Sequence, residues 1–262
     1  MTRERRDVFG EAVEQYANAR PGYPEEMVDD VLSYGDPTAD VLEVGAGTGK
    51  ATVAFAARGV SLTCLEPDPR MAARLEVECA TYPNVAIVVA RLENWFVPRR
   101  YDVLVAAQSW HWVDPARRWD LAHDAVRTGG TIALFWNKYI VAKDDTRAVL
   151  ADIDRCYHVD SGSPNGVTSR VYPDEITLDE GWPAYGLASD ARFEDLVSRR
   201  YRRRQAFSTQ RYLDLLASTS SYRMIDESAR NALMDEVGAV VEHDGGEVEL
   251  ALVTDLFLGR TT

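Results

Sequence analysis

The sequence has few cysteines, a deficit of basic residues and no long apolar run, and each shortage narrows what the protein can be. Its three cysteines, Cys64, Cys79 and Cys156, form no Cys-x-x-Cys pair, so neither a zinc site nor a disulfide framework is indicated. We expect them to be reduced packing residues. The 29 Lys and Arg against 42 Asp and Glu give a formal net charge of -13. This balance disfavours nucleic acid as a partner, because phosphate binding depends on clustered cationic side chains.

Long hydrophobic segments are also missing. No stretch approaches the roughly 20 apolar residues that cross a bilayer. The charged start at residues 1–7 is followed by no apolar core of a secretion signal. The sequence therefore predicts a cytoplasmic protein without a membrane partner. With 262 residues, 46% of them hydrophobic, the chain can bury a sizeable core, and we predict one domain over residues 1–262.

The most informative stretch is VLEVGAGTGKAT at residues 41–52. It reads as a buried strand, a glycine turn and a helix start, since alternate glycines let a backbone bend sharply and approach a ligand closely. A phosphate-binding P-loop would need an earlier glycine and a Ser or Thr after the lysine, where Val44 and Ala51 stand. A dinucleotide turn places its third glycine one residue later than Gly49. The remaining interpretation is a nucleoside that carries an amino acid instead of a phosphate.

The next expected strand, SLTCLE at residues 61–66, ends in an acid. A carboxylate at this position, Glu66, can accept hydrogen bonds from both ribose hydroxyls of a nucleoside. The alternative is a solvated loop glutamate, which the glycine turn one unit earlier disfavours. Pro67 and Met71 would then be apolar neighbours of the adenine face, although Met71 can equally pack in the core.

On these residues the sequence resembles the class I methyltransferases that use S-adenosylmethionine, whose first motif is an acid followed by alternate glycines. The resemblance extends from about Phe9 to the C-terminus and is nearest to the small-molecule branch, of the trans-aconitate methyltransferase kind. It implies transfer of a methyl group from S-adenosylmethionine to an O, N or C atom of a small organic molecule. The positions that match cofactor contacts are Tyr16, Arg20, Glu43, Gly45, Ala46, Gly47, Gly49, Glu66, Pro67, Met71, Leu92, Glu93 and Gln108.

The alternation of strands and helices predicts an α/β fold with a doubly wound, mostly parallel sheet. By the resemblance, this sheet has seven strands, the last of them antiparallel, and carries a helical and loop cap. We predict an N-terminal lid over residues 9–35 and a cap insertion on the substrate side over residues 141–191. The insertion contains a long polar segment, and irregular loops of this length are usually functional covers or disordered linkers. Its inserted aromatic residues favour a cover.

Two lid residues match positions near the methionine end of the cofactor in the resembling family. Arg20 can make a forked pair with a carboxylate, and Tyr16 can donate a hydrogen bond or simply pack. The alternative is a surface arginine and a core tyrosine. After the third expected strand, family members often carry an acidic pair, but this sequence has Ala90-Arg91. The adenine-reading role therefore moves to Leu92 and Glu93, with an exposed glutamate as the alternative.

The second informative stretch, QSWHWVDP, follows the fourth expected strand, residues 102–107. In open parallel sheets the ligand lies beyond the carboxyl ends of the strands, which places Gln108, His111 and Trp112 near the transferable methyl. Trp110 and Trp112 can form a wall for a planar or apolar acceptor, and His111 can accept a proton as a catalytic base. The alternative is a packed loop in which His111 caps a carbonyl. Alignment of the acceptor alone can suffice for methyl transfer.

The fifth expected strand, residues 131–137, ends on the same side of a parallel sheet. Asn137 and Tyr139 are therefore further substrate-binding candidates, beside Trp110, His111 and Trp112. A helix over residues 115–127 is expected to end before the Gly-Gly pair that precedes this strand.

The basic run RRYRRR at residues 199–204 has two interpretations. A nucleic-acid patch is one, but a strand would divide these side chains between its two faces. The acidity of the whole chain favours local ion pairs on a solvated strand instead.

Two other functions remain open from the sequence. A nicotinamide-dependent oxidoreductase is disfavoured by the displaced third glycine. A protein that binds S-adenosylmethionine without transferring its methyl group would carry the same motifs, because a fold does not settle a function. No metal site is expected, and the acceptor is not specified by any motif.

Overall fold

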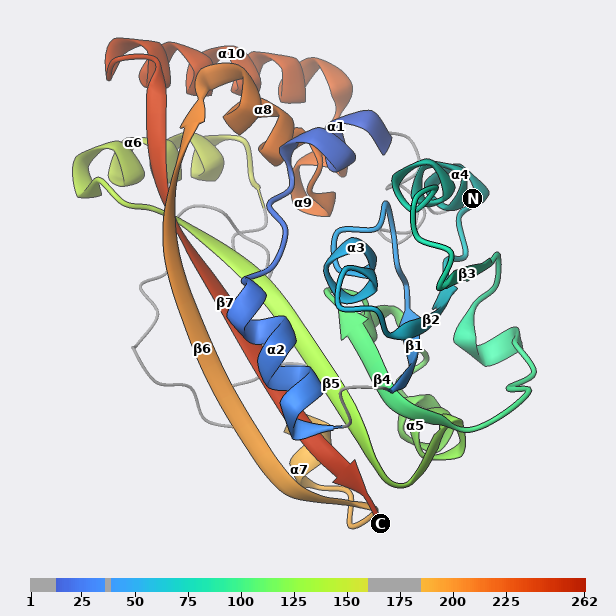
Figure 1. Ribbon diagram of the computed structural model, residues 1–262. Helices are drawn as coiled ribbons and strands as arrows, with labels where there is room; N and C mark the ends of the chain where they lie inside the picture. Colours follow the sequence, from blue (N-terminus) through green and yellow to red (C-terminus); the bar gives the residue numbers. More distant parts are fainter. Residues whose placement is uncertain (1–12, 36–38, 160–184) are drawn as a thin grey trace. The chain divides into compact units, whose positions relative to one another are not determined.

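The computed structural model describes residues 13–35, 39–159 and 185–262 (Figure 1). Its first half contains α1 (Val13–Ala19), α2 (Glu25–Tyr34), β1 (Asp40–Val44), α3 (Thr52–Ala56), β2 (Ser61–Leu65), α4 (Pro69–Glu78), β3 (Val85–Val88), η3 (Leu92–Asn94), β4 (Tyr101–Ala107), η4 (Trp110–Trp112) and α5 (Arg118–Ala125). The second half contains β5 (Val126–Val141), α6 (Asp144–Cys156), α7 (Tyr185–Ala188), β6 (Phe193–Ser208), α8 (Thr209–Ala217), α9 (Ser220–Arg223), α10 (Glu227–His243) and β7 (Glu247–Thr261). Most of the predicted lid is described, whereas residues 160–184 of the predicted insertion lie outside the described parts.

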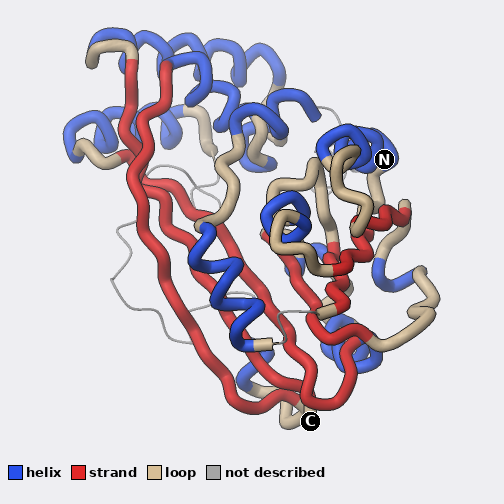
Figure 2. The backbone as a smooth tube through the Cα atoms, viewed as in Figure 1, coloured by secondary structure: helices blue, strands red, loops and turns tan. Residues whose placement is uncertain are grey.

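The strands form one seven-stranded sheet in the order β3-β2-β1-β4-β5-β7-β6. Strands β1 to β5 pair in parallel where they are neighbours, and β7 is antiparallel. The predicted doubly wound seven-stranded sheet is therefore confirmed, and its strands can be followed in Figure 2. The strand order reverses between β1 and β4. In such sheets this is where a crevice opens for ligands beyond the carboxyl ends of the strands.

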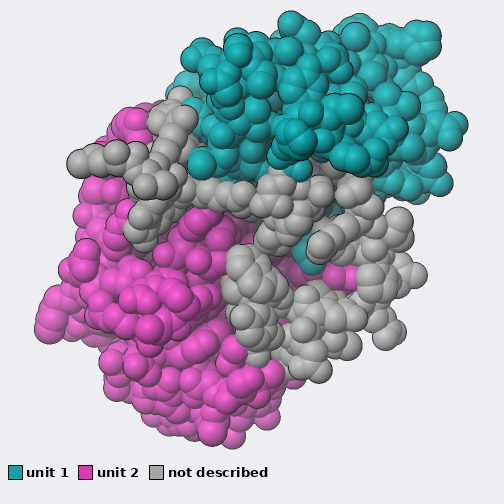
Figure 3. Space-filling model, turned by 180° about the vertical axis from the view of Figure 1, so that it is seen from behind, with its two compact units in different colours: residues 1–20, 137–173, 202–253 teal, residues 21–136, 174–201, 254–262 magenta. Residues whose placement is uncertain are grey.

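The chain folds into two compact units, which Figure 3 shows in separate colours. Unit 1 comprises residues 1–20, 137–173 and 202–253, and unit 2 comprises residues 21–136, 174–201 and 254–262. The strands β5, β6 and β7 each have residues in both units.

The central parallel strands of unit 2, β1 and β4, are buried on both faces, whereas β3 at the sheet edge is partly exposed. Successive residues of a strand point to opposite faces, so Val41 and Leu42 of β1 belong to two different apolar clusters, as do Val103 and Leu104 of β4. The first cluster includes Met27 and Val31 of α2, Phe55 of α3 and Leu75 of α4. The second includes Ala122 of α5, Trp110 and Phe257. Coverage on both faces explains why apolar residues stand at successive positions in these strands.

Unit 1 has its own apolar core, formed mainly by helices. In α10, the residues Leu233, Val237 and Val241 recur every fourth position and are all buried, which gives one apolar stripe. The helix starts at an N-cap, Asp226, whose side chain accepts a hydrogen bond from the Ser228 N–H at 3.0 Å. The stripe packs in one cluster with residues of α6, α8 and β7.

Three expectations from the sequence are wrong in detail. The fifth strand begins at Val126 instead of residue 131, and the preceding helix covers Arg118–Ala125 instead of 115–127. The Gly-Gly pair lies inside β5, where Gly129 has a φ of 72° and the pairing with β4 shifts register. Such a bulge lets a strand continue through glycines that would otherwise end it. Cys156 is exposed, so it is not a packing residue.

The basic run lies in β6 and forms ion pairs, as expected from the sequence. Arg199 pairs with Asp30, and Arg204 with Glu249. The side chain of Arg200 is not solvated, however, because it is 3% exposed and forks onto Asp255, which is 1% exposed. The two nitrogen–oxygen distances of this fork are 2.5 and 2.9 Å.

We expect Asp255→Ala to lower the free energy of unfolding by about 3–5 kcal/mol, since it leaves a guanidinium buried without its carboxylate. Urea unfolding measures this change. Glu249→Ala is the matched control, because it breaks the exposed Arg204 pair and should change stability by less than about 1 kcal/mol. A loss in Asp255→Ala no larger than in the control would contradict the prediction.

Candidate functional site

The turn after β1 is built on glycines in the left-handed region. Gly45, Gly47 and Gly49 have φ values of 71°, 60° and 92°. The N–H groups of Gly45 and Ala46 donate to the carbonyl of Leu65 at 2.8 and 3.0 Å. The expected sharp turn is therefore present, and it is tied directly to the end of β2.

Beside two of these glycines, the space that a side chain would fill is occupied by other side chains of the protein. A Cβ on Gly45 would lie 2.6 Å from Ser109 Cβ, and one on Gly49 would lie 2.8 Å from Leu75 Cδ1. Ser109 also donates a hydrogen bond from its Oγ to the carbonyl of Val44. Packing within the protein is therefore enough to require glycine at positions 45 and 49. The expectation that these glycines make room for a ligand needs separate support. Ser109 was not identified from the sequence, since nothing in its local pattern indicates this long-range contact.

Glu66 is buried and held by two backbone N–H groups. Its Oε2 accepts from Gly47 at 2.7 Å, and its Oε1 accepts from Asp68 at 2.8 Å. Burial raises the pKa of Glu66, although these two hydrogen bonds act in the opposite direction. Each carboxylate oxygen retains a further lone pair. The side chain is thus fixed at the end of β2 with acceptor capacity left for two hydroxyl groups.

Glu43 is fully buried under the same turn. Its Oε2 accepts a hydrogen bond from Thr52 Oγ1 at 2.6 Å and lies 3.6 Å from Cys64 Sγ. Burial raises its pKa to about 7, so a large fraction of this carboxyl group is protonated at neutral pH.

Three buried side-chain oxygens near the carboxyl ends of β1 and β4 have no hydrogen-bond partner among the described residues: Glu43 Oε1, Thr48 Oγ1 and Gln108 Oε1. Gln108 also has a φ of 55°, which is rare for a residue with a side chain. Its Nε2 donates to the hydroxyl of Tyr23 at 3.4 Å. Buried polar atoms are nearly always paired, so three unpaired oxygens around one turn fit a polar ligand. Thr48 was not identified from the sequence because threonine is unremarkable in a turn.

His111 lies in η4 against two tryptophans. Its ring centroid is 4.4 Å from that of Trp112, and Trp136 Nε1 donates to His111 Nδ1 at 3.5 Å. Burial, reinforced by the charge of Arg118, lowers the pKa of His111 to about 4. The ring is therefore neutral at pH 7 and carries its proton on Nε2. At this pKa, His111 is a weak general base at neutral pH. Trp136 was missed because its contact with the loop depends on strand pairing.

The residues expected to read adenine have structural contacts of their own. Leu92 is buried in the second apolar cluster of unit 2. Glu93 Oε1 accepts a hydrogen bond from the Asp114 N–H at 2.8 Å, which fixes the loop that follows η4. Ala46 and Met71 are buried, whereas Pro67 is exposed.

The expected acceptor-side residues fall in both units. Trp110, in unit 2, is fully buried and its ring lies 5.5 Å from that of Trp119, so the structure shows a packing role for it. Asn137 and Tyr139 are buried residues of unit 1.

Tyr16 and Arg20 also belong to unit 1. Arg20 is buried, and its Nε and Nη2 donate to the side chain and the carbonyl of Ser218 at 2.8 and 3.1 Å. Its guanidinium lies 4.9 Å from the ring centroid of Tyr16. Ser218 is the C-cap of α8, so Arg20 places a positive charge at a helix C-terminus.

Comparison with known proteins adds independent information. Residues 41–130 match the family of the methyltransferase domain. Over 145 residues the chain is 39% identical to an uncharacterized methyltransferase of Mycobacterium tuberculosis, which covers 52% of this chain and 56% of that protein. A probable S-adenosylmethionine-dependent methyltransferase of Saccharomyces cerevisiae is 26% identical over 127 residues, or 46% of this chain and 43% of that protein. The chain thus spans about half the length of the curated relatives it matches.

The segment that matches the methyltransferase domain is residues 41–130. This segment holds the glycine turn, Glu66, Gln108 and His111. The fold of the chain is similar to that of a putative type II methyltransferase from Anaeromyxobacter dehalogenans, with a TM-score of 0.64, 20% identity and coverage of 92% of this chain and 97% of that one.

No described helix is both long and apolar enough to cross a membrane. Within residues 13–35, 39–159 and 185–262, no group of three or more His, Cys, Asp or Glu side chains is arranged to hold a metal ion.

We expect Gly45→Ala to destabilise the protein by about 2–5 kcal/mol, because a left-handed φ and a contact of 2.6 Å act together. The matched control is Gly59→Ala, where φ is 80° but a Cβ would meet nothing within 4 Å. This control should lose only about 1–2 kcal/mol. Adding Ser109→Gly to Gly45→Ala should recover part of the loss, and equal losses in both alanine variants would contradict a packing role for Gly45.

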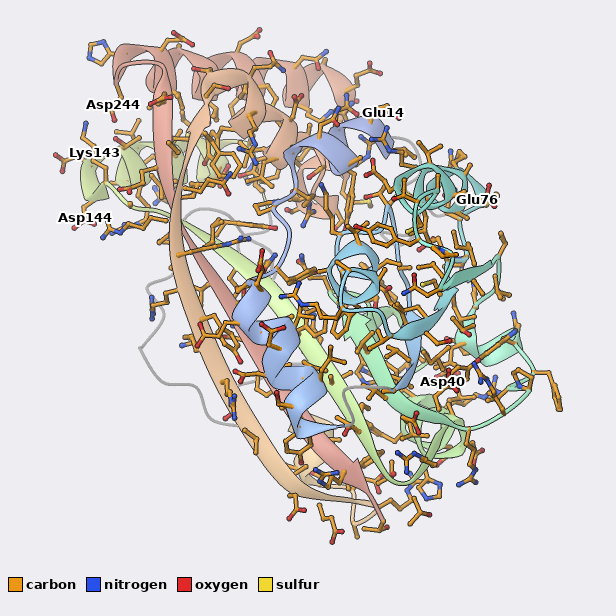
Figure 4. The ribbon with its side chains drawn as sticks, viewed as in Figure 1. Glu14, Asp40, Glu76, Lys143, Asp144 and Asp244 are labelled. Atoms are coloured by element: carbon orange, nitrogen blue, oxygen red, sulfur yellow. The ribbon has the colours of Figure 1, made fainter. Side chains whose placement is uncertain are left out.

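The raised pKa of Glu43 predicts a pH dependence. The folded state binds this proton up to about pH 7, while the unfolded chain releases it near 4.5. The contribution of Glu43 to unfolding free energy therefore falls as pH rises from about 4.5 to 7, by about 3 kcal/mol. Glu43→Gln should remove this fall, as seen by comparing urea unfolding at pH 5 and pH 8. The control is Glu76→Gln, at an exposed position of α4 labelled in Figure 4. A Glu43→Gln variant with the wild-type pH profile would refute the assignment.

Proposed function

We propose that the protein transfers a methyl group from S-adenosylmethionine to an O, N or C atom of a small organic molecule. The observation that carries this proposal is Glu66, fixed by the Gly47 and Asp68 N–H groups beside the glycine turn, inside the segment that matches the methyltransferase domain. The unpaired oxygens of Glu43, Thr48 and Gln108 support it, because a polar ligand would supply the hydrogen-bond partners that these atoms lack.

The proposed cofactor contacts follow from this geometry. Glu66 would accept from the ribose hydroxyls, and the backbone of residues 45–49 would lie beside the nucleoside. The sulfonium of the bound cofactor supplies an electrophilic methyl group. Tyr16 and Arg20 are proposed for the amino-acid end, and Pro67, Met71, Leu92 and Glu93 for the neighbourhood of adenine, as the resemblance to class I methyltransferases implies.

On the acceptor side, we assign His111 a positioning role. The ring is neutral at pH 7 and lies against Trp112, while its low pKa makes it a weak base. Rate then derives mainly from alignment of the acceptor with the methyl group. Trp112 is proposed as an aromatic wall beside it, from a ring that is only partly buried.

A small-molecule acceptor is favoured over a nucleic acid by the net charge of -13. The finer resemblance to trans-aconitate methyltransferase-like proteins stays a proposal, as does a cytoplasmic location. A protein that binds the cofactor without transferring its methyl is the alternative, and it would release no S-adenosylhomocysteine with any acceptor.

Isothermal titration with S-adenosylmethionine tests the cofactor assignment. We expect the wild type to bind and Glu66→Ala to bind about 10- to 100-fold more weakly, since charge-assisted hydrogen bonds are worth about 1.5–3 kcal/mol. Glu76→Gln, which changes an exposed glutamate of α4, should bind like the wild type. Absence of heat from the wild type, or an unchanged affinity in Glu66→Ala, would refute the assignment.

A further inference from the structure

Unit 1 contains a dense set of polar groups within its apolar core. Four consecutive buried residues carry hydroxyl groups here: Ser218 and Thr219 connect α8 to α9, and Ser220 and Ser221 begin α9. Asp154 of α6 is buried as well. Three tyrosines pack in one cluster with apolar residues such as Leu150 and Leu215: Tyr139 of β5, Tyr212 of α8 and Tyr222 of α9.

Most of these groups are satisfied within unit 1. The hydroxyl of Tyr222 donates to the carboxylate of Asp154, with oxygen–oxygen distances of 2.8 and 2.9 Å. Ser218 Oγ and Thr219 Oγ1 donate to the carbonyls of Leu215 and Leu216 at 2.7 and 2.9 Å. The hydroxyl groups of Ser218, Thr219 and Tyr222 therefore all have partners within unit 1.

Two phenols are exceptions. The hydroxyl groups of Tyr139 and Tyr212 are buried and have no hydrogen-bond partner in the part of the chain that the structure describes. Their residues are 1% and 0% exposed, so bulk solvent does not satisfy them. Phenylalanine would fill the same space without leaving a buried donor unpaired, which makes the two hydroxyls costly unless something binds them.

The surroundings limit what this partner can be. Burial, together with the nearby charge of Asp154, raises the pKa of Tyr212 above its usual range, so this phenol stays protonated and carries a hydrogen to donate. A carboxylate or phosphate ligand would be repelled by Asp154 and would lose hydration in an apolar core. A neutral molecule with oxygen acceptors meets neither obstacle.

We propose that unit 1 binds a neutral small molecule whose carbonyl, ether or hydroxyl oxygens accept hydrogen bonds from Tyr139 and Tyr212. This site needs no bound cofactor, so its binding can be measured without S-adenosylmethionine. If the proposed function holds, the same class becomes the first to test as methyl acceptor, because hydroxyl oxygens and carbons beside carbonyls can both be methylated.

Stability measurements separate a ligand site from a site filled by structural water. We expect Tyr139→Phe and Tyr212→Phe to raise the melting temperature by about 2–6 °C, since each removes an unpaired buried hydroxyl. Tyr222→Phe is the matched control and should lower it, because this hydroxyl is bonded to Asp154. If the first two variants melt below the wild type, their hydroxyls have a permanent partner such as a buried water, and the proposal is overturned.

Binding is then measured on the whole chain by isothermal titration with cyclohexanone. Cyclohexylammonium and cyclohexanecarboxylate serve as charged molecules of similar shape. We expect the ketone to bind the wild type and to bind about 5- to 10-fold more weakly after Tyr139→Phe or Tyr212→Phe, with little binding of the charged molecules. Absence of ketone binding, an affinity unchanged in both variants, or preference for a charged molecule would each overturn the proposal, whatever the outcome of the titration with S-adenosylmethionine.

Discussion

The contact between Gly45 and Ser109 is the constraint on which the rest of the site depends. It lies where β1 and β4 are neighbours at the reversal of strand order, and the Ser109 hydroxyl bonded to Val44 holds the two strand ends together. The end of β2 is attached to the same turn, because the Leu65 carbonyl accepts hydrogen bonds from the Gly45 and Ala46 N–H groups. Glu66 directly follows Leu65, and Gln108 directly precedes Ser109. Their positions are therefore set by packing of the protein against itself, before any ligand binds.

This constraint changes the meaning of the glycine motif. Gly45 and Gly49 are needed because Ser109 and Leu75 occupy the space that a side chain would fill. A chain could keep both glycines for folding alone, so the motif by itself is weak evidence for a cofactor. Stronger evidence comes from groups that folding does not require, such as the unpaired oxygens of Thr48 and Gln108. These atoms make the site less stable in the absence of a ligand, which is a common property of binding sites.

The sequence predicted those features that depend on local pattern. The strands β1 and β4 were recognisable because both of their faces are apolar, and Glu66 because a strand ends there. The start of β5 was missed because Arg127, Thr128 and two glycines hide a strand that continues through a bulge. Ser109 and Trp136 were missed as parts of the site for a different reason. Their roles come from contacts with residues more than 20 positions away in the chain, and no local pattern encodes such a contact.

Electrostatics connects the composition of the chain to its proposed cofactor. An acidic protein attracts cations over a distance, and S-adenosylmethionine carries a positive sulfonium. Close to the site, burial raises the pKa of Glu43 to about 7, which reduces its negative charge when no ligand is bound, and burial raises the pKa of Glu66 as well. A bound cation favours the ionised form of nearby carboxyl groups, so it lowers their pKa values. Binding of the cofactor and loss of a proton from these groups are then linked. This linkage makes the affinity increase with pH over the range in which the carboxyl groups titrate.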